Sequence, residues 1–170
     1  MFGAIYLQPG HCDSRIMPEV IHHPAGTGPT TWFGDAIYTF KATAEATGGS
    51  LTLAEASVPP GGGPPPHIHP RNDEAFFILA GEIEFLNGTE TFRAGEGGFV
   101  FVPRGTRHRF RNVGLHVARM LFLFTPAAME GFFREIGTDA RAGAAPGPMT
   151  PRQLQQITEL APKYGLQLAP

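Results

Sequence analysis

Short stretches in which apolar residues dominate or alternate with polar ones follow one another between residues 32 and 124. Successive side chains of a strand point to opposite faces of a sheet, so this pattern predicts β-strands. Turn residues separate them at intervals of about 8 to 12 residues, which is typical of a β-sandwich or barrel. The expected strands are residues 32–41, 50–58, 74–85 with a break at Ala80-Gly81, 89–92, 98–102, 107–113 and 116–124.

Two segments between the strands carry turn signals. Asn87-Gly88 lies between apolar stretches and predicts a hairpin with a two-residue type I′ turn. Residues 59–66 read Pro-Pro-Gly-Gly-Gly-Pro-Pro-Pro, which has the composition of a linker. A linker here would leave too short a piece in front of it for a comfortable core. The alternative is a tight turn followed by an extended approach, in which prolines with φ near about −65° hold the next residues in place.

The C-terminal residues have a helical pattern. Thr125 can cap a helix that has Pro126 at its first position, residues 127–136 as its body and Gly137 as its stop. Thr150 and Gln153 form a capping box for a second helix that ends before Pro162. An apolar stripe on the first helix predicts packing against the β core: Met129, Phe132, Phe133 and Ile136. We therefore expect one domain made of an N-terminal arm (1–30), a β-barrel (31–125) and a helical extension (126–170).

Composition narrows the class of protein. A chain of 170 residues suits one domain. Its net charge of −2 argues against the basic surface that a nucleic-acid-binding protein needs. No stretch approaches the length of apolar sequence that a membrane helix needs. Cys12 is the single cysteine, which excludes an internal disulfide or a thiolate metal cluster. With an N-terminus that makes a poor signal peptide, we expect a cytoplasmic protein.

Four residues have the chemistry of a metal site. His67 and His69 are two apart, so in an extended segment both imidazoles point the same way. Glu74 lies at an odd offset from them, but residues 70–73 have turn chemistry that can reset the strand phase. His108, on a later strand, could close the site. Three imidazoles and a carboxylate suit one divalent transition metal ion, whether Fe, Ni, Co, Mn, Cu or Zn.

The surroundings of these residues form two longer motifs. The first is Gly61-x5-His67-x-His69-x4-Glu74-x6-Gly81, and the second is Gly97-x5-Pro103-x-Gly105-x2-His108-x3-Asn112. They resemble the two cupin motifs in full. The resemblance implies an all-β cupin jelly roll (a double-stranded β-helix) with the C-terminal helices packed on its outside, and it implies that the four residues are metal ligands. For the remaining histidines we expect ordinary roles: His11, His22, His23 and His116.

Strand parity places further side chains. If Glu74 and His108 point inward, so do Phe76, Ile78 and Phe110. We expect these three to line an apolar substrate pocket, together with some of Phe99, Phe101, Phe122 and Phe124. The opposite face of the same strand, with Phe77 at its centre, is also apolar and needs a cover. The C-terminal helices or a second subunit could provide it, and because cupins commonly pair in this way we expect a homodimer. Arginines on the strand of His108 face outward, as on a solvated surface: Arg107, Arg109 and Arg111.

A second resemblance concerns activity. Residues 127–137 look like the C-terminal helix of single-domain cupins related to bacterial flavonol (quercetin) dioxygenases. That resemblance implies an oxygenase in which Glu74 binds the metal and also takes a proton from a hydroxyl of a small aromatic or flat apolar substrate. Two alternatives stay open: a redox-neutral metal enzyme (isomerase, cyclase or decarboxylase) and a non-catalytic ligand-binding cupin. The complete ligand set argues against the last of these.

Overall fold

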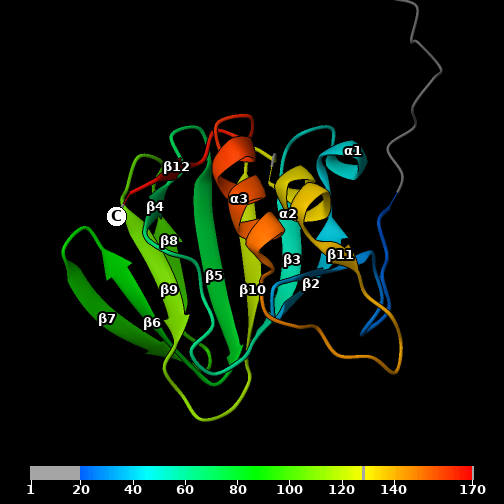
Figure 1. The fold of residues 1–170 in the computed structure, drawn as a ribbon, viewed down its shortest axis with the longest axis horizontal. Coiled ribbons are helices and arrows are strands. Elements are labelled where there is room, and N and C mark those ends of the chain that lie inside the picture. Colours follow the sequence, from blue (N-terminus) through cyan, green and yellow to red (C-terminus); the bar gives the residue numbers. More distant parts are fainter. Residues whose placement is uncertain (1–19, 128, 170) are drawn as a thin grey trace, which may run out of the picture.

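The computed structural model describes residues 20–127 and 129–169, which form two antiparallel β-sheets and three helices (Figure 1). The large sheet has the strand order β11-β1-β2-β3-β10-β5-β8, and the small sheet has the order β12-β4-β9-β6-β7. The strands of the large sheet are β1 (Thr30–Phe33), β2 (Ala36–Ala42), β3 (Thr52–Val58), β5 (Asp73–Ala80), β8 (Phe99–Val102), β10 (Ala118–Thr125) and β11 (Thr138–Asp139). Those of the small sheet are β4 (His67–Ile68), β6 (Glu82–Asn87), β7 (Glu90–Gly95), β9 (His108–Asn112) and β12 (Gln167–Leu168). The expected jelly-roll architecture is confirmed.

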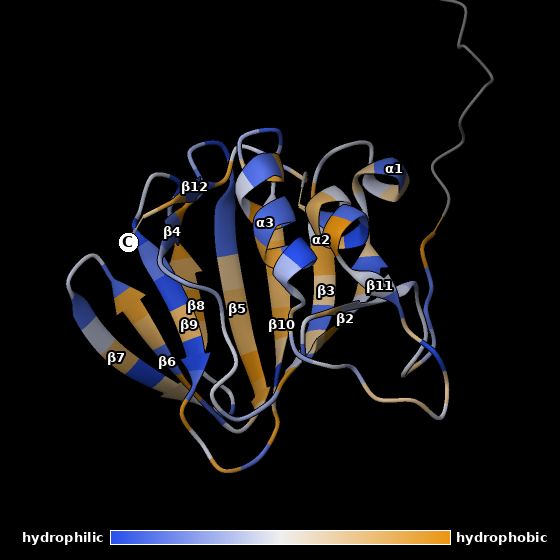
Figure 2. Cartoon of the chain, in the orientation of Figure 1, coloured by the Kyte–Doolittle hydropathy of each residue, from blue (hydrophilic) through white to orange (hydrophobic). Residues whose placement is uncertain are grey.

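The core lies between the two sheets. Alternate residues of β3 and β10 are buried, so each strand has one face in the core, as the hydrophobic pattern predicts. Phe76 of β5 joins the sheets: its ring centroid lies 5.1 Å from that of Phe85 on β6 and 5.6 Å from that of Phe110 on β9. Figure 2 shows hydrophobic residues along β3, β5 and β10 and mostly hydrophilic ones on β9.

Helices α2 (Glu130–Ile136) and α3 (Pro151–Leu160) lie beside one another at one end of the barrel (Figure 1), and the short α1 spans Ala44–Thr47. The apolar stripe of α2 is buried, as predicted. Phe133 packs on inward-pointing rings of the large sheet, 4.5 Å from Tyr38 and 5.9 Å from Phe122. The helices therefore cover the open end of the barrel and its inner face, rather than the outer face of a sheet.

Two predicted elements need correction in the first half of the barrel. Residues 32–41 form a hairpin of β1 and β2 instead of one strand, because Gly34 has a φ of +61° and reverses the chain. The second hairpin pairs Asn87 with Glu90, so its turn residues are Gly88 and Thr89. Only Gly88 has positive φ (+62°), which fits a type II′ turn and not the predicted type I′.

The first C-terminal helix begins later than predicted. Thr125 pairs with Asp73 and belongs to β10, and its hydroxyl donates to the backbone of Ser50. It therefore cannot cap the helix, which starts at Glu130. The predicted stop at Gly137 and the capping box of Thr150 and Gln153 are confirmed.

Residues 59–66 form a turn inside the domain. The Gly62 amide donates to the carbonyl of Pro59, and two backbone hydrogen bonds join Gly61 and Gly62 to Asn112 at the end of β9. The segment therefore enters β4 from a fixed position, as the turn alternative requires. Residues 1–19, with His11, Cys12 and most of the expected N-terminal arm, lie outside the described residues. No helix of the described part is long and apolar enough to cross a membrane.

Candidate metal centre and adjoining cavity

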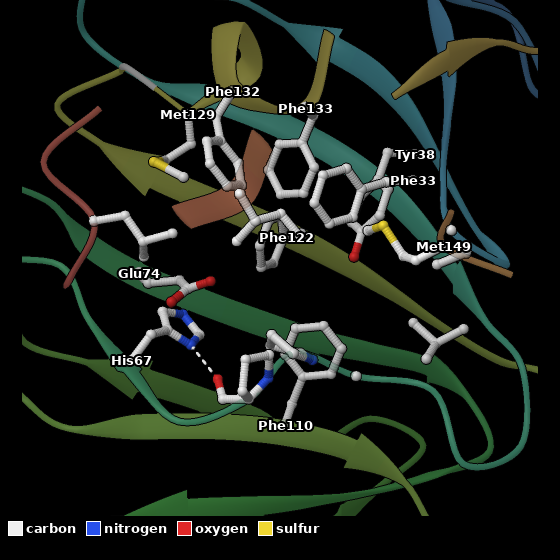
Figure 3. A pocket seen from close by; sticks show the side chains of 18 of the residues that line it. Phe33, Tyr38, His67, Glu74, Phe110, Phe122, Met129, Phe132, Phe133 and Met149 are labelled. Carbon is white, nitrogen blue, oxygen red and sulfur yellow. Dashed lines mark hydrogen bonds between the residues drawn. The ribbon is translucent and has the colours of Figure 1, made fainter. Parts of the chain in front are cut away.

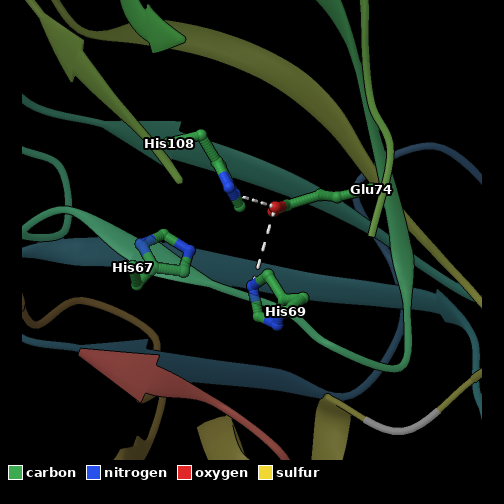
Figure 4. Close-up of side chains that lie close together, drawn as sticks. All are labelled: His67, His69, Glu74 and His108. Carbon is green, nitrogen blue, oxygen red and sulfur yellow. Dashed lines mark hydrogen bonds and ion pairs between the residues drawn. The ribbon is translucent and has the colours of Figure 1, made fainter. Parts of the chain in front are cut away.

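The four predicted ligands come together between the sheets (Figure 4). His67 lies on β4, His69 just after it, Glu74 on β5 and His108 on β9. One ligand atom from each lies within 4.8 Å of the others. The four side chains are nearly inaccessible to solvent, with relative exposures of 6%, 3%, 1% and 2% in that order. We refer to these residues as the histidine–glutamate cluster.

Backbone carbonyls orient two of the imidazoles. His67 Nδ1 donates to the carbonyl of Pro65 at 2.9 Å, and His108 Nδ1 donates to that of Thr106 at the same distance. Each Nδ1 therefore holds the proton of the neutral ring, which leaves Nε2 free to act as a ligand atom. The extended segment that contains Pro65 therefore fixes the imidazole ring of His67 as well as its backbone.

The turn between His69 and Glu74 is held by contacts with other loops. The Asn72 side chain donates to the carbonyl of Pro126, and the Gly105 amide donates to the carbonyl of His69. Asp73 accepts three hydrogen bonds from Arg104, one of them from its backbone amide. These contacts reset the strand phase, as expected, and turn Glu74 toward the histidines.

The electrostatics of the cluster favour the neutral, ligand-competent form of two imidazoles, those of His67 and His69. Burial lowers the pKa of His67 to about 4, and burial with the neighbouring histidines lowers the pKa of His69 to about 2. Burial also raises the pKa of Glu74. Burial alone would lower the pKa of His108, but its hydrogen bond and attraction to Glu74 outweigh that effect and raise it.

The contact between His108 and Glu74 tests whether a cation fits. His108 Nε2 lies 2.6 Å from Glu74 Oε2, although His108 Nδ1 already donates elsewhere. The two groups must therefore share an additional proton, and a cation at this point would take that proton's place. Imidazole nitrogens and a carboxylate oxygen are the donors that divalent transition metals accept. The cluster could hold such an ion.

A cavity of about 220 Å³ adjoins the cluster, with His67, His69 and Glu74 in its wall (Figure 3). Phe110 lines it, as predicted. Phe76 and Ile78 do not: they point inward but are buried in the core among other side chains. Most of the wall is aromatic or aliphatic and comes from both the barrel and the C-terminal segment: Phe33, Phe122, Phe124, Met129, Phe132, Phe133, Met149, Leu154, Ile157, Leu166 and Leu168.

Of the other phenylalanines named from the sequence, Phe122 and Phe124 line the cavity, whereas Phe99 and Phe101 do not and are exposed. Sequence reasoning missed the rest of this wall. It identified the apolar stripe of α2 but assigned it to packing, and it did not single out Tyr38 of β2. The parity of Ala36, Tyr38 and Phe40 along β2 gives the inward face of Tyr38. Nothing in the local pattern gives the position of α3, because that depends on how the helix docks.

None of the other histidines in residues 20–127 and 129–169 belongs to the cluster. His22, His23 and His116 are exposed. Of the arginine stripe that was expected to face solvent, only Arg111 is exposed, and Arg107 and Arg109 are half-buried. Arg107 donates to the backbone carbonyls of Gly88 and Ala169, and Arg109 pairs with Glu84 at 3.0 Å.

Comparison with known proteins identifies the family. The model of the Cupin domain family matches residues 54–124, which contain the whole cluster. The chain is 30% identical over 103 residues to the tetracenomycin polyketide synthase protein TcmJ of Streptomyces glaucescens, covering 61% of this chain and 68% of that protein. The chain belongs to the cupin superfamily.

Other relatives of this cupin point the same way. It is 37% identical over 102 residues to the polyketide synthase CurC of Streptomyces cyaneus, covering 59% of this chain and just under two thirds (64%) of that protein. Among solved structures, KdgF from Halomonas sp. superposes with a TM-score of 0.51 at 20% identity, covering 57% of this chain and 84% of that one. This likeness shows the shared fold. The C-terminal helices lie beyond the residues that the family model matches.

Proposed function

We propose that this cupin is a metal-dependent oxygenase that acts on a small aromatic or flat apolar substrate. The observation that carries the proposal is the position of the histidine–glutamate cluster in the wall of an apolar, aromatic-rich cavity. An apolar pocket with a few convergent polar groups suits such a ligand. The reaction class is taken from the resemblance of residues 127–137 to the C-terminal helix of cupins related to flavonol dioxygenases.

Different residues would bind the metal, accept the proton and position the substrate. His67, His69, Glu74 and His108 would hold one divalent transition metal ion, which would supply Lewis acidity toward an enol or phenol oxygen of the substrate. Glu74 would accept the proton that this oxygen loses, because its carboxylate faces the cavity. The aromatic side chains of the wall would hold the flat substrate in place and exclude water from the site of proton transfer.

A redox-neutral reaction is the second candidate, favoured by the similarity to CurC and TcmJ, which are named as polyketide synthase proteins. Polyketide chains carry enolisable carbonyl groups, and their deprotonation by Glu74 would prepare an isomerisation or cyclisation. The first proton transfer would be the same in both candidates, and they differ in whether O2 is consumed.

Oxygen consumption separates the two. The protein loaded in turn with Fe, Ni, Co, Mn, Cu or Zn is mixed with a panel of flavonols, phenols and polyphenolic β-diketones, and O2 uptake and substrate loss are followed together. The oxygenase proposal predicts that uptake accompanies substrate loss. Turnover that continues without O2 would instead establish the redox-neutral reaction. Absence of turnover with every metal and substrate class would contradict an enzymatic function for these probes.

A further inference from the structure

Tyr38 places a phenol hydroxyl in the wall of the apolar cavity. The side chain is 5% exposed and lines the same cavity as Glu74. No hydrogen bond joins its hydroxyl to another group in the described parts of the chain. Buried tyrosines usually satisfy their hydroxyl. This one is therefore available to a molecule in the cavity.

The ring that carries this hydroxyl is firmly held. It packs against Phe133, Phe122 and Phe33, at centroid distances of 4.5, 5.9 and 6.3 Å. These neighbours come from α2, β10 and β1, so three different elements fix the ring. A hydrogen bond to a ligand would then require little further ordering of the side chain.

The hydroxyl acts as a donor. Burial, and then the negative charges of Glu74 and Asp35, raise the pKa of Tyr38 well above its ordinary value. The phenol therefore keeps its proton throughout the physiological range. Figure 3 shows the hydroxyl directed into the cavity, on the side across from Glu74, with Phe122 and Phe110 also lining the space.

We infer that the Tyr38 hydroxyl is a second polar anchor for the substrate, donating a hydrogen bond to an acceptor oxygen at the end of the molecule far from the histidine–glutamate cluster. The ligand class is then a flat molecule with oxygens at both ends and an apolar middle. This inference rests on the proposed function, since it assumes that one end of the substrate lies at the cluster.

The test uses two probes and a matched pair of variants. Naphthalene-2,3-diol can place its paired oxygens at the cluster, and its 6-acetyl derivative adds an acceptor carbonyl at the far end. Binding of both to the zinc-loaded protein is measured by calorimetry for the parent, Tyr38→Phe and Tyr164→Phe. Tyr164 provides the control, because its hydroxyl donates to Glu135 and it is not part of the cavity wall.

The acetyl group should tighten binding to the parent and to Tyr164→Phe by roughly 3- to 10-fold, the range for one neutral hydrogen bond, and should give no gain in Tyr38→Phe. An acetyl gain that persists in Tyr38→Phe, or that is missing in the parent while the plain diol binds, overturns the inference alone. If neither diol binds the zinc-loaded parent, the cluster is not the anchor for such molecules and both proposals fail.

A second measurement needs no variant and covers the case in which Tyr38→Phe does not fold. In parent protein carrying 13C at the tyrosine Cζ position, the acetyl derivative should shift the Tyr38 resonance beyond the shift that the plain diol produces. The Tyr164 resonance should stay in place with both probes. Equal Tyr38 shifts with the two probes would contradict the inference.

Discussion

Glu74 supplies the negative charge that three neutral imidazoles lack. It is 1% exposed and contacts His108 at 2.6 Å and His69 at 3.6 Å. A buried carboxylate is costly unless something compensates it. In the proposed enzyme the bound cation provides that compensation in the resting state, and the substrate proton provides it during the reaction.

Replacing Glu74→Gln tests this role. The amide keeps the shape of the side chain but can neither balance the cation nor accept a proton. We expect turnover to fall by about 10²- to 10⁴-fold, the usual contribution of a general base, and metal affinity to fall as well. Metal content and steady-state kinetics are the measurements. A variant that retains both its metal and its activity would show that Glu74 is not the base.

The elements that carry the ligands are held by a backbone contact that tolerates no side chain. Gly63 has a φ of +143°, and a Cβ at this position would lie 2.1 Å from the Phe110 carbonyl oxygen. Phe110 is two residues beyond His108, and Gly63 begins the approach to His67. The glycine therefore lets the segment before β4 lie directly against β9, so that both histidines reach one point.

We expect Gly63→Ala to destabilise the fold by more than about 3 kcal/mol, because the backbone must move as well as adopt a strained φ. Gly61→Ala is the matched control: its φ is +78°, but its Cβ would meet nothing within 4 Å, so a cost of about 1 to 2 kcal/mol is expected. Urea unfolding measures both. Equal losses for the two variants would refute the proposed role of the close contact.

At the scale of strands and helices, much of the molecule could be predicted from the sequence. The period of two along β3 and β10, and the spacing of His67, His69, Glu74 and His108, are local signals that give strands and candidate ligands. The start of α2 could not be predicted, because Thr125 satisfies strand pairing with Asp73 instead of capping a helix. The lining by Leu154 and Ile157 depends on the docking of α3, which no local pattern encodes.

For the whole molecule, the outer face of the large sheet is the feature that residues 20–127 and 129–169 leave uncovered. Phe77, Phe99 and Phe101 are 41%, 65% and 52% exposed on neighbouring strands β5 and β8. The C-terminal helices pack elsewhere, so of the two covers expected from the sequence only a second subunit is left. We propose a homodimer in which this face meets its own copy about a two-fold axis, with β8 at the sheet edge.

Sedimentation velocity tests the dimer. The parent should sediment as a dimer. The double variant Phe99→Asp/Phe101→Asp should sediment as a monomer, because the dimer interface would bury carboxylates that have no partner of opposite charge. Thr91→Asp, exposed on the small sheet, should leave the dimer intact. A parent that is monomeric at micromolar concentration would contradict the proposed assembly.

The central claim is that the histidine–glutamate cluster holds one metal ion, and metal content measures it directly. Each protein is stripped with a chelator, reloaded with Zn, Ni or Co, dialysed and analysed for metal per chain. We predict one equivalent in the parent and in His116→Ala, whose imidazole is exposed, and a large loss of affinity in His108→Ala. If His108→Ala bound metal as tightly as the parent, the account of the site would be wrong.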